Sequence, residues 1–183
     1  MLERIRRGDP DAFEAVARDH APRLFRLAMR MTGRREEAED LVQETLVRAL
    51  PALSRFEGRA RISTYLIRAL GNLWKNRLRS KKRSRLVAWF RGAPGEEDET
   101  PELDPADDAP SAHELLERED RAEQVRRAVV RLEPARRWTL LLREVEEMSY
   151  EEIAGVTGVA VGTVRSRLAR ARDELRRLME ASL

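Results

Sequence analysis

The sequence contains no cysteine, which excludes disulfide bonds and thiolate metal sites. Its only histidines, His20 and His113, are too few for an ordinary zinc site. No run approaches the roughly 20 apolar residues of a membrane-spanning helix, and residues 1–10 lack the apolar segment of a signal peptide. We therefore expect a cytoplasmic protein that holds no metal or cofactor and inserts into no membrane.

Aromatic residues are also scarce, at 5% of the 183 residues, and the runs of Val and Ile that favour strands are missing. Leu, Ala, Arg and Glu, which have high helix propensity, dominate the composition instead. The apolar share of 42% is enough to build small cores between helices. The composition predicts an all-α fold.

Charge is unevenly distributed along the chain, although the formal net charge is only +3. Eight basic residues and no acid lie between Arg68 and Arg85, whereas eight acids and no base lie between Glu96 and Asp108. The segment 91–111 also contains four prolines and two glycines, a composition typical of disorder. The pattern predicts two small helical domains, residues 1–88 and 112–183, joined by a flexible acidic linker, residues 89–111.

Start and stop signals divide each predicted domain into helices. In the first domain we expect helices over residues 10–32, 36–50 and 63 onward, with Pro22 kinking or splitting the first and a loop over residues 51–63. In the second domain we expect helices over residues 111–132, 134–146 and 150–157, and a last helix after Gly158.

Residues 150–168 fit a helix-turn-helix. Ala154 is small where the two helices would cross, Gly158 supplies the turn, and Val164 would pack back from the second helix. This spacing is moderately specific for a helix-turn-helix, since other sequences contain it by chance. The second helix belongs to the stretch "GVAVGTVRSRLARARDELRRLM", which contains six arginines and two acids.

A helical period sorts this arginine-rich stretch into two faces. The stripe expected to be buried contains Val161, Val164, Leu168, Ala171, Leu175 and Leu178. Small residues form a ridge opposite it (Gly162, Ser166 and Ala169), and arginines line its two edges (Arg165, Arg172 and Arg176; Arg167, Arg170 and Arg177). Such a helix suits a DNA major groove, where arginines reach phosphates and the ridge approaches base edges. The weaker alternative is a solvated helix whose arginines pair with acids.

The helix expected from residue 63 has a polar face that suits single-stranded nucleic acid. That face combines an aromatic ring, two amides and several cations: Tyr65, Arg68, Asn72, Lys75, Asn76 and Arg79. These groups offer base stacking, hydrogen bonds and phosphate contacts. Trp74 is expected in the core, and Tyr65 is interpreted equally well as a boundary residue.

The helix expected over residues 36–50 has an acidic outer face. Leu41, Val42, Thr45 and Ala49 can be buried, which leaves Glu36, Asp40, Gln43, Glu44 and Val47 outside. Acids would repel DNA, and an apolar Val47 among them suggests a protein partner. A solvent-exposed face that has no partner and contains one valine explains the pattern equally well.

Taken together, these segments resemble the sigma-70 family of bacterial transcription initiation factors, in its extracytoplasmic function (ECF) group. "GDPDAFEAVARDH" and "EEAEDLVQETLVRAL" are similar to the start of region 2, and "FEGRARISTYLIRALGNLWKNRLR" to its promoter-melting segment. "MSYEEIAGVTGVAVGTVRSRLARARDELR" is similar to the region 4 helix-turn-helix. Departures from the family pattern include Tyr65 for a tryptophan, Asn76 for an aspartate and Ala160 for a capping serine.

The resemblance implies three binding surfaces. Core RNA polymerase would bind the chain through its β and β′ subunits. The helix expected over residues 36–50 would contact the polymerase at Asp40, Gln43, Glu44 and Val47. The −10 promoter element would be recognised and melted by Phe56, Arg59, Ser63, Tyr65, Arg68, Asn72, Asn76 and Arg79. The −35 element would be bound by Thr163, Arg165, Ser166, Arg167, Ala169, Arg170 and Arg172. The family also implies an anti-sigma partner, and the linker acids are interpreted either as RNA mimics or as a plain tether.

Two other classes of function remain as alternatives. A conventional helix-turn-helix regulator would bind duplex DNA without polymerase, usually as a dimer on paired half-sites. An enzyme is disfavoured, because the sequence has no Gly-rich phosphate loop, no metal-ligand spacing and no nucleophile–base motif.

Overall fold

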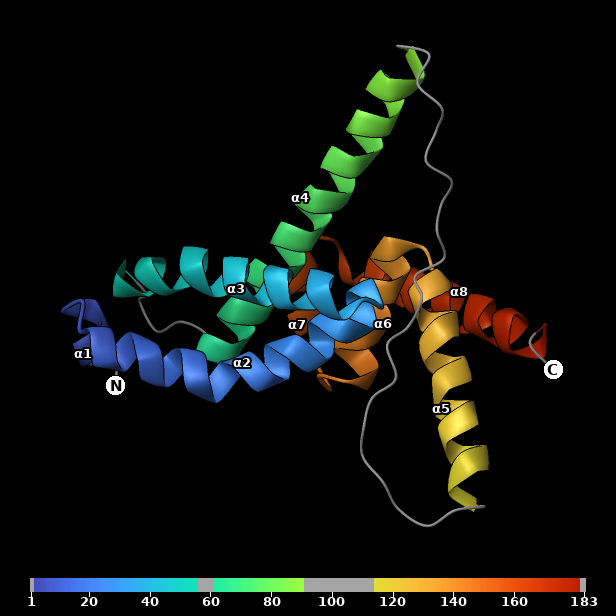
Figure 1. The fold of residues 1–183 in the computed structure, drawn as a ribbon, viewed down its shortest axis with the longest axis horizontal. Helices are drawn as coiled ribbons and strands as arrows, with labels where there is room; N and C mark the ends of the chain where they lie inside the picture. Colours follow the sequence, from blue (N-terminus) through green and yellow to red (C-terminus); the bar gives the residue numbers. More distant parts are fainter. Residues whose placement is uncertain (1, 56–60, 91–113, 182–183) are drawn as a thin grey trace. The chain divides into compact units, whose positions relative to one another are not determined.

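The computed structural model describes residues 2–55, 61–90 and 114–181. Every regular element in this part of the chain is helical, which confirms the all-α prediction. In chain order (Figure 1) the elements are α1 (Leu2–Arg6), α2 (Pro10–Thr32), α3 (Arg35–Ala52), the 3-10 helix η1 (Leu53–Arg55), α4 (Ile62–Phe90), α5 (Glu114–Arg131), α6 (Pro134–Glu144), α7 (Tyr150–Thr157) and α8 (Val161–Glu180). None of the described helices is long and apolar enough to cross a bilayer.

The chain divides into two compact units. One contains Met1–Ala28 and Glu39–Thr100, and the other contains Met29–Ala38 and Pro101–Leu183. The predicted linker lies outside the described residues except at its start, where α4 continues to Phe90. The domain boundaries at residues 88 and 112 therefore stay predictions.

Pro22 lies inside α2, which runs through it as a single helix. A proline at this position removes one backbone hydrogen bond. On the same helix, however, Val16, Leu24 and Leu27 are buried in the core of the first unit. Burial of these side chains offsets the lost hydrogen bond, so the helix is not split, which was one of the two outcomes expected for Pro22.

The segment expected as a loop after residue 50 begins as helix. Pro51 and Ala52 end α3, and η1 follows directly. Short α1, which the sequence did not predict, packs against η1, and Ile5 and Leu53 are fully buried there. This local core explains why the chain stays helical beyond the expected end of the helix.

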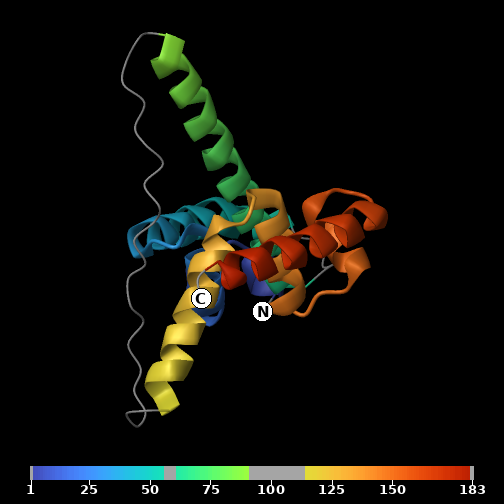
Figure 2. The same cartoon turned by 90° about the vertical axis from the view of Figure 1, so that its right-hand side faces the viewer.

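α4 is anchored by its first half. Leu66, Ile67, Leu70, Leu73 and Trp74 are buried, as the helical period predicts. In Figures 1 and 2 the second half of α4 extends past α2 and α3. Its exposed side chains in that half are mainly basic: Arg79, Lys81, Lys82 and Arg83.

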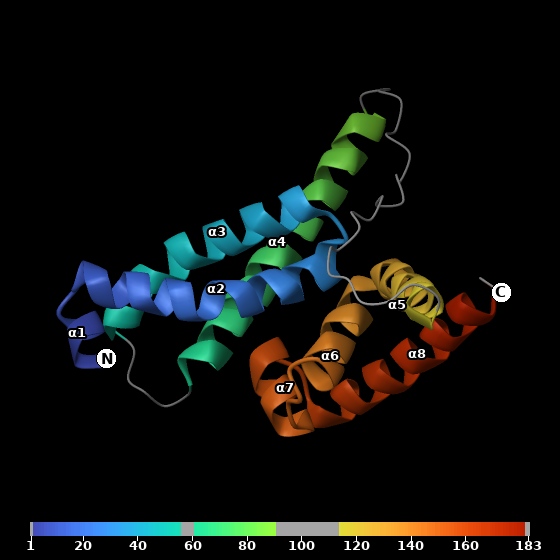
Figure 3. The ribbon, with the colours of Figure 1, turned by 60° about the horizontal axis from the view of Figure 1, so that its bottom comes forward.

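The second unit is built around α8, which α5, α6 and α7 contact (Figure 3). Val164, Leu168 and Ala171 of α8 are buried together with Leu142 of α6 and Ile153 of α7. These three α8 residues belong to the apolar stripe that the helical period predicts, whereas its other members, Val161, Leu175 and Leu178, are half-buried. The arginine-rich helix is therefore held by its apolar face and presents its polar face to solvent.

The connection between α7 and α8 has helix-turn-helix geometry. Gly158 has a φ of 71°, in the left-handed region that glycine adopts at little cost. Its N–H donates to the carbonyl of Ala154 at 2.8 Å, which closes α7. α8 follows Ala160, whose side chain makes no capping hydrogen bond. The helix-turn-helix prediction is confirmed.

Ser149 and Glu152 form a capping box at the start of α7. Ser149 Oγ accepts from the Glu152 N–H at 3.1 Å, and Glu152 Oε2 accepts from the Ser149 N–H at 2.8 Å. Ser149→Ala leaves one N–H of the first turn without its acceptor. We expect it to lower the free energy of unfolding by about 0.5–2 kcal/mol. Thermal unfolding followed by circular dichroism measures the loss, and a midpoint equal to that of the exposed control Ser80→Ala would contradict it.

Arg137 ties α6 to the end of α5 from inside the second unit. Its side chain is buried, and its guanidinium donates to the main-chain carbonyls of Val130 and Leu132, the latter at 3.0 Å. Burial lowers the pKa of Arg137 to about 10, so the group stays charged at neutral pH. This arginine is structural and does not add to the cationic surface of α8.

Candidate nucleic-acid interface

The outer face of α8 is open to solvent along its whole length. Gly162, Arg165, Ser166 and Ala169 are exposed, and Thr163 is half-buried at the side of this ridge. Because the residues of the ridge, Gly162, Ser166 and Ala169, are all small, a flat surface can approach the helix backbone closely. The arrangement permits close approach to base edges in a major groove.

The arginines of α8 differ in how far their charge is compensated. Arg165 and Arg170 are exposed, Arg167 is half-buried, and none of the three forms an ion pair with another residue that the structure describes. Arg172, in contrast, donates from Nη2 to Glu144 Oε1 of α6 at 2.7 Å. Chiefly through this hydrogen bond, Glu144 raises the pKa of Arg172. The strongest uncompensated charge therefore lies on the first half of α8.

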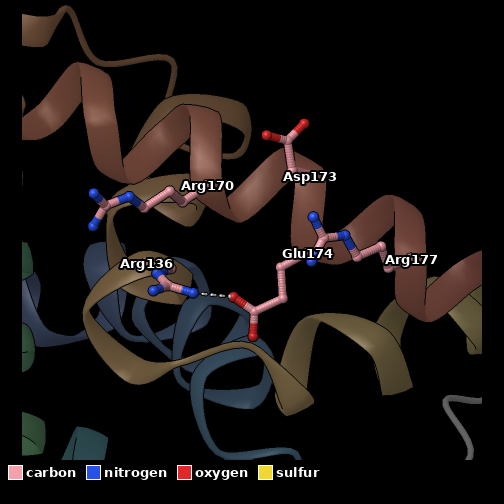
Figure 4. A pocket seen from close by; sticks show the side chains of 5 residues that line it. All are labelled: Arg136, Arg170, Asp173, Glu174 and Arg177. Carbon is pink, nitrogen blue, oxygen red and sulfur yellow. Dashed lines mark hydrogen bonds and ion pairs between the residues drawn. The ribbon is translucent and has the colours of Figure 1, made fainter.

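A shallow cavity of about 260 Å³ opens beside α8 in the second unit (Figure 4). Arg136 of α6 reaches across to α8 and donates from Nη1 to Glu174 Oε2 at 2.6 Å. The remaining lining side chains come from α8: Arg170, Asp173 and Arg177. Asp173 also accepts from Arg176 at 3.4 Å, so Asp173 and Glu174 are both occupied by arginines.

Sequence reasoning missed Arg136 and Glu144. Their partners, Glu174 and Arg172, lie 38 and 28 residues further along the chain. No periodicity within one helix connects residues on two different helices. These two ion pairs can be identified only once the packing of α6 against α8 is known.

The polar face of α4 is exposed where the sequence placed it. Arg68, Asn72, Asn76 and Arg79 are exposed, and Lys75 lies beside them. Ser63 is half-buried at the start of the helix. Phe56 and Arg59 lie outside the described residues, so their proposed role stays a prediction.

Tyr65 is half-buried at the edge of this polar face. Its hydroxyl donates to the carbonyl of Ala49 in α3 at 3.4 Å. The ring therefore packs along the α3–α4 boundary, as expected for a boundary residue. Trp74 is in the core, as expected, with 6% of its surface exposed.

The outer face of α3 is mixed in charge rather than simply acidic. Asp40 and Gln43 are exposed, and Val47 is 66% exposed, the largest exposed fraction of any large apolar side chain that the structure describes. Glu44 is half-buried and forms ion pairs with Arg48 of α3 and Arg77 of α4. In the described part of the chain, no cluster of histidines and acids is suited to hold a metal ion.

The comparisons with known proteins match both units. Residues 16–84 match the family model described as sigma-70 region 2, and residues 122–175 match the one described as sigma-70, region 4. This chain belongs to the sigma-70 family. Its relatives place it among the ECF sigma factors, which confirms the resemblance found in the sequence.

Several curated sigma factors are similar to this one over most of its length. The RNA polymerase sigma-H factor of Pseudomonas aeruginosa is 33% identical, and the alignment covers 100% of this chain and 94% of the relative. The ECF RNA polymerase sigma-E factor of Escherichia coli is 31% identical, with 96% and 90% covered. The ECF RNA polymerase sigma factor SigE of Mycolicibacterium smegmatis is 32% identical over 90% of this chain, which spans 60% of that longer relative.

Solved structures of sigma factors share the fold. The sigma factor RpoE of Bartonella quintana, solved in complex with the anti-sigma factor NepR, superposes with a TM-score of 0.70 at 27% identity. That match covers 92% of this sigma factor and 97% of the other chain. CnrH, solved with the cytosolic domain of CnrY, has a TM-score of 0.65 at 21% identity, a likeness of fold.

Proposed function

We propose that this ECF sigma factor binds core RNA polymerase, brings it to promoters with a −35 and a −10 element, and helps open the duplex. The observation that carries the proposal is the presence of region 2 and region 4 in order on one chain. Each region also exposes a different polar face, one on α4 and one on α8. A protein that binds only duplex DNA would not need the exposed polar face of α4.

α8 is proposed to read the −35 element in duplex form. Arg165, Ser166 and Ala169 would approach base edges, whereas Thr163, Arg167, Arg170 and Arg172 would hold the flanking phosphates. Arginine is the usual donor to guanine in the major groove, since its two N–H groups match the O6 and N7 acceptors. Arg165 directly precedes Ser166 of the small-residue ridge and is exposed.

α4 and the segment before it are proposed to bind the −10 element as a single strand. Amide and cationic side chains on one exposed face supply base hydrogen bonds and phosphate contacts. The residues are those predicted from the sequence: Phe56, Arg59, Ser63, Tyr65, Arg68, Asn72, Asn76 and Arg79.

α3 is proposed to dock on the β′ subunit through Asp40, Gln43, Glu44 and Val47, while β contacts other parts of the factor. Exposed Val47 adds an apolar contact to a face of charged and amide groups, a combination that suits a protein partner. The factor would act in the cytoplasm, catalyse no reaction itself, and be held inactive by an anti-sigma protein. The solved complex of the Bartonella quintana factor with NepR supports this last proposal.

Transcription with purified components tests the proposed function. Core polymerase alone, core with this factor, and core with a housekeeping sigma factor are compared on a library of randomised promoters. We expect transcripts that depend on this factor and share two elements. Transcripts that appear only when the housekeeping factor is also present would favour a conventional regulator instead.

Asn72→Ala tests the melting role of α4. Asn72 is exposed, so its amide is available to a base of the opened strand. Loss of one such hydrogen bond should slow promoter opening by roughly 2- to 10-fold and leave closed-complex affinity unchanged. A template with a pre-opened −10 bubble should restore the normal rate. Equal loss in closed-complex formation and opening would contradict the role.

A further inference from the structure

Arg77 of α4 belongs to neither DNA-binding face. It continues the stripe of Leu66, Leu70 and Leu73, which are buried against the rest of the first unit. One turn after Leu73 the stripe therefore ends in an arginine. Asn72, Asn76 and Arg79 lie on the exposed side of the helix, whereas Arg77 faces α3.

The Arg77 guanidinium makes two different contacts with α3. Its Nε donates to Glu44 Oε2 at 3.1 Å, and its Nη2 contacts the same oxygen. Nη2 also donates to the main-chain carbonyl of Asp40 at 3.3 Å. A rigid fork that bridges a carboxylate and a carbonyl one turn apart fixes both groups in one arrangement.

Glu44 is thus held on both of its oxygens. Arg48 binds Oε1 from within α3, and Arg77 binds Oε2 from α4. With 28% of its side chain exposed, Glu44 remains accessible to a partner beside exposed Asp40 and Val47. A glutamate that is already immobilised loses little conformational freedom when a partner binds it.

We propose that Arg77 is a positioning residue that preorganises Glu44 for core RNA polymerase and fixes the docking face of α3 relative to the melting helix α4. This inference rests on the proposed binding of core polymerase by α3. It assigns Arg77 a role in protein binding, although the residue lies within the basic run that otherwise suggests DNA.

A double-mutant cycle tests the proposal by measuring the affinity of the full chain for core RNA polymerase. Arg77→Met keeps the length and apolar stem of the side chain, so the fold and the thermal midpoint should be preserved. It should weaken core binding by roughly 3- to 10-fold, because a freed Glu44 must be ordered on binding. In the Glu44→Gln background the same change should have no further effect. Lys82→Met, an exposed change of equal charge, is the matched control.

Arg77→Lys adds a second test, because lysine keeps the charge but lacks the planar fork. We expect it to recover only part of the affinity that Arg77→Met loses. A loss that is equally large with and without Glu44, or no loss at all, would overturn the proposal and leave the sigma function standing. Failure of the unmodified chain to bind core polymerase would overturn both.

Discussion

Asp40→Arg is expected to weaken binding of this sigma factor to core RNA polymerase by roughly 100-fold or more. Asp40 is exposed on the proposed docking face of α3, where an acid is expected to meet a basic partner surface. An arginine at this position would place like charges together, at a cost of several kcal/mol. The side chain of Asp40 is also solvent-facing, so the substitution should leave the fold intact. Equilibrium binding to core polymerase measures the loss.

Asp19→Arg is the matched control for this prediction. Asp19 is an exposed acid on α2, outside every proposed interface, and its reversal changes the net charge by the same amount. It should bind core polymerase normally. If Asp40→Arg also binds normally, α3 is not the docking surface.

Arg165→Ala is expected to weaken recognition of the −35 element by about 1–3 kcal/mol, or roughly 5- to 150-fold. Arg165 is exposed next to the small-residue ridge of α8 and has no ion-pair partner in the described part of the chain, so its fork is available to a base. The measurement is promoter affinity of the polymerase complex on matched and mutated −35 sequences. Besides losing affinity, the variant should discriminate less between these sequences.

Arg165→Lys separates base reading from phosphate contact. Lysine keeps the charge but not the paired donors, so a base-reading arginine should be rescued poorly by lysine and a phosphate contact well. Arg131→Ala, at the exposed end of α5, controls for the loss of one charge. Unchanged specificity in Arg165→Ala would remove this residue from the reading set.

The helices and their faces could be predicted from the sequence because these features are local. Apolar spacing in α8 was enough to identify Val164, Leu168 and Ala171 as buried and Ser166 and Ala169 as exposed. Gly158 likewise marks the turn by itself, since few other residues adopt its φ of 71° cheaply. Each of these patterns is contained within the residues of a single helix or turn.

Contacts between helices could not be predicted in this way. Arg77 and Glu44 are 33 residues apart, and their pairing depends on how α4 crosses α3. From the sequence, Glu44 was one acid of an acidic face, whereas the structure shows its charge held by two arginines. From the sequence, Arg172 was one of the arginines beside the ridge of α8, whereas the structure shows it bound by Glu144 of α6. Charge counted along the chain therefore overestimates the charge available at the surface.

Rules based on the local sequence also gave incomplete predictions of the helices where tertiary packing determines whether a segment is helical. α1 has only five residues, too few for a periodic pattern, and it forms beside buried Leu53. Pro51 was expected to follow a helix, yet it lies inside α3, and Pro22 does not split α2, one of the two outcomes expected for it. In each case burial of neighbouring apolar side chains outweighs the unfavourable local preference.

Co-purification with bacterial core RNA polymerase at moderate salt tests the central claim most directly. The account predicts a stoichiometric complex of this chain with core polymerase that survives size-exclusion chromatography. Absence of a complex, together with tight binding of the free protein to duplex DNA, would contradict it and identify a conventional helix-turn-helix regulator.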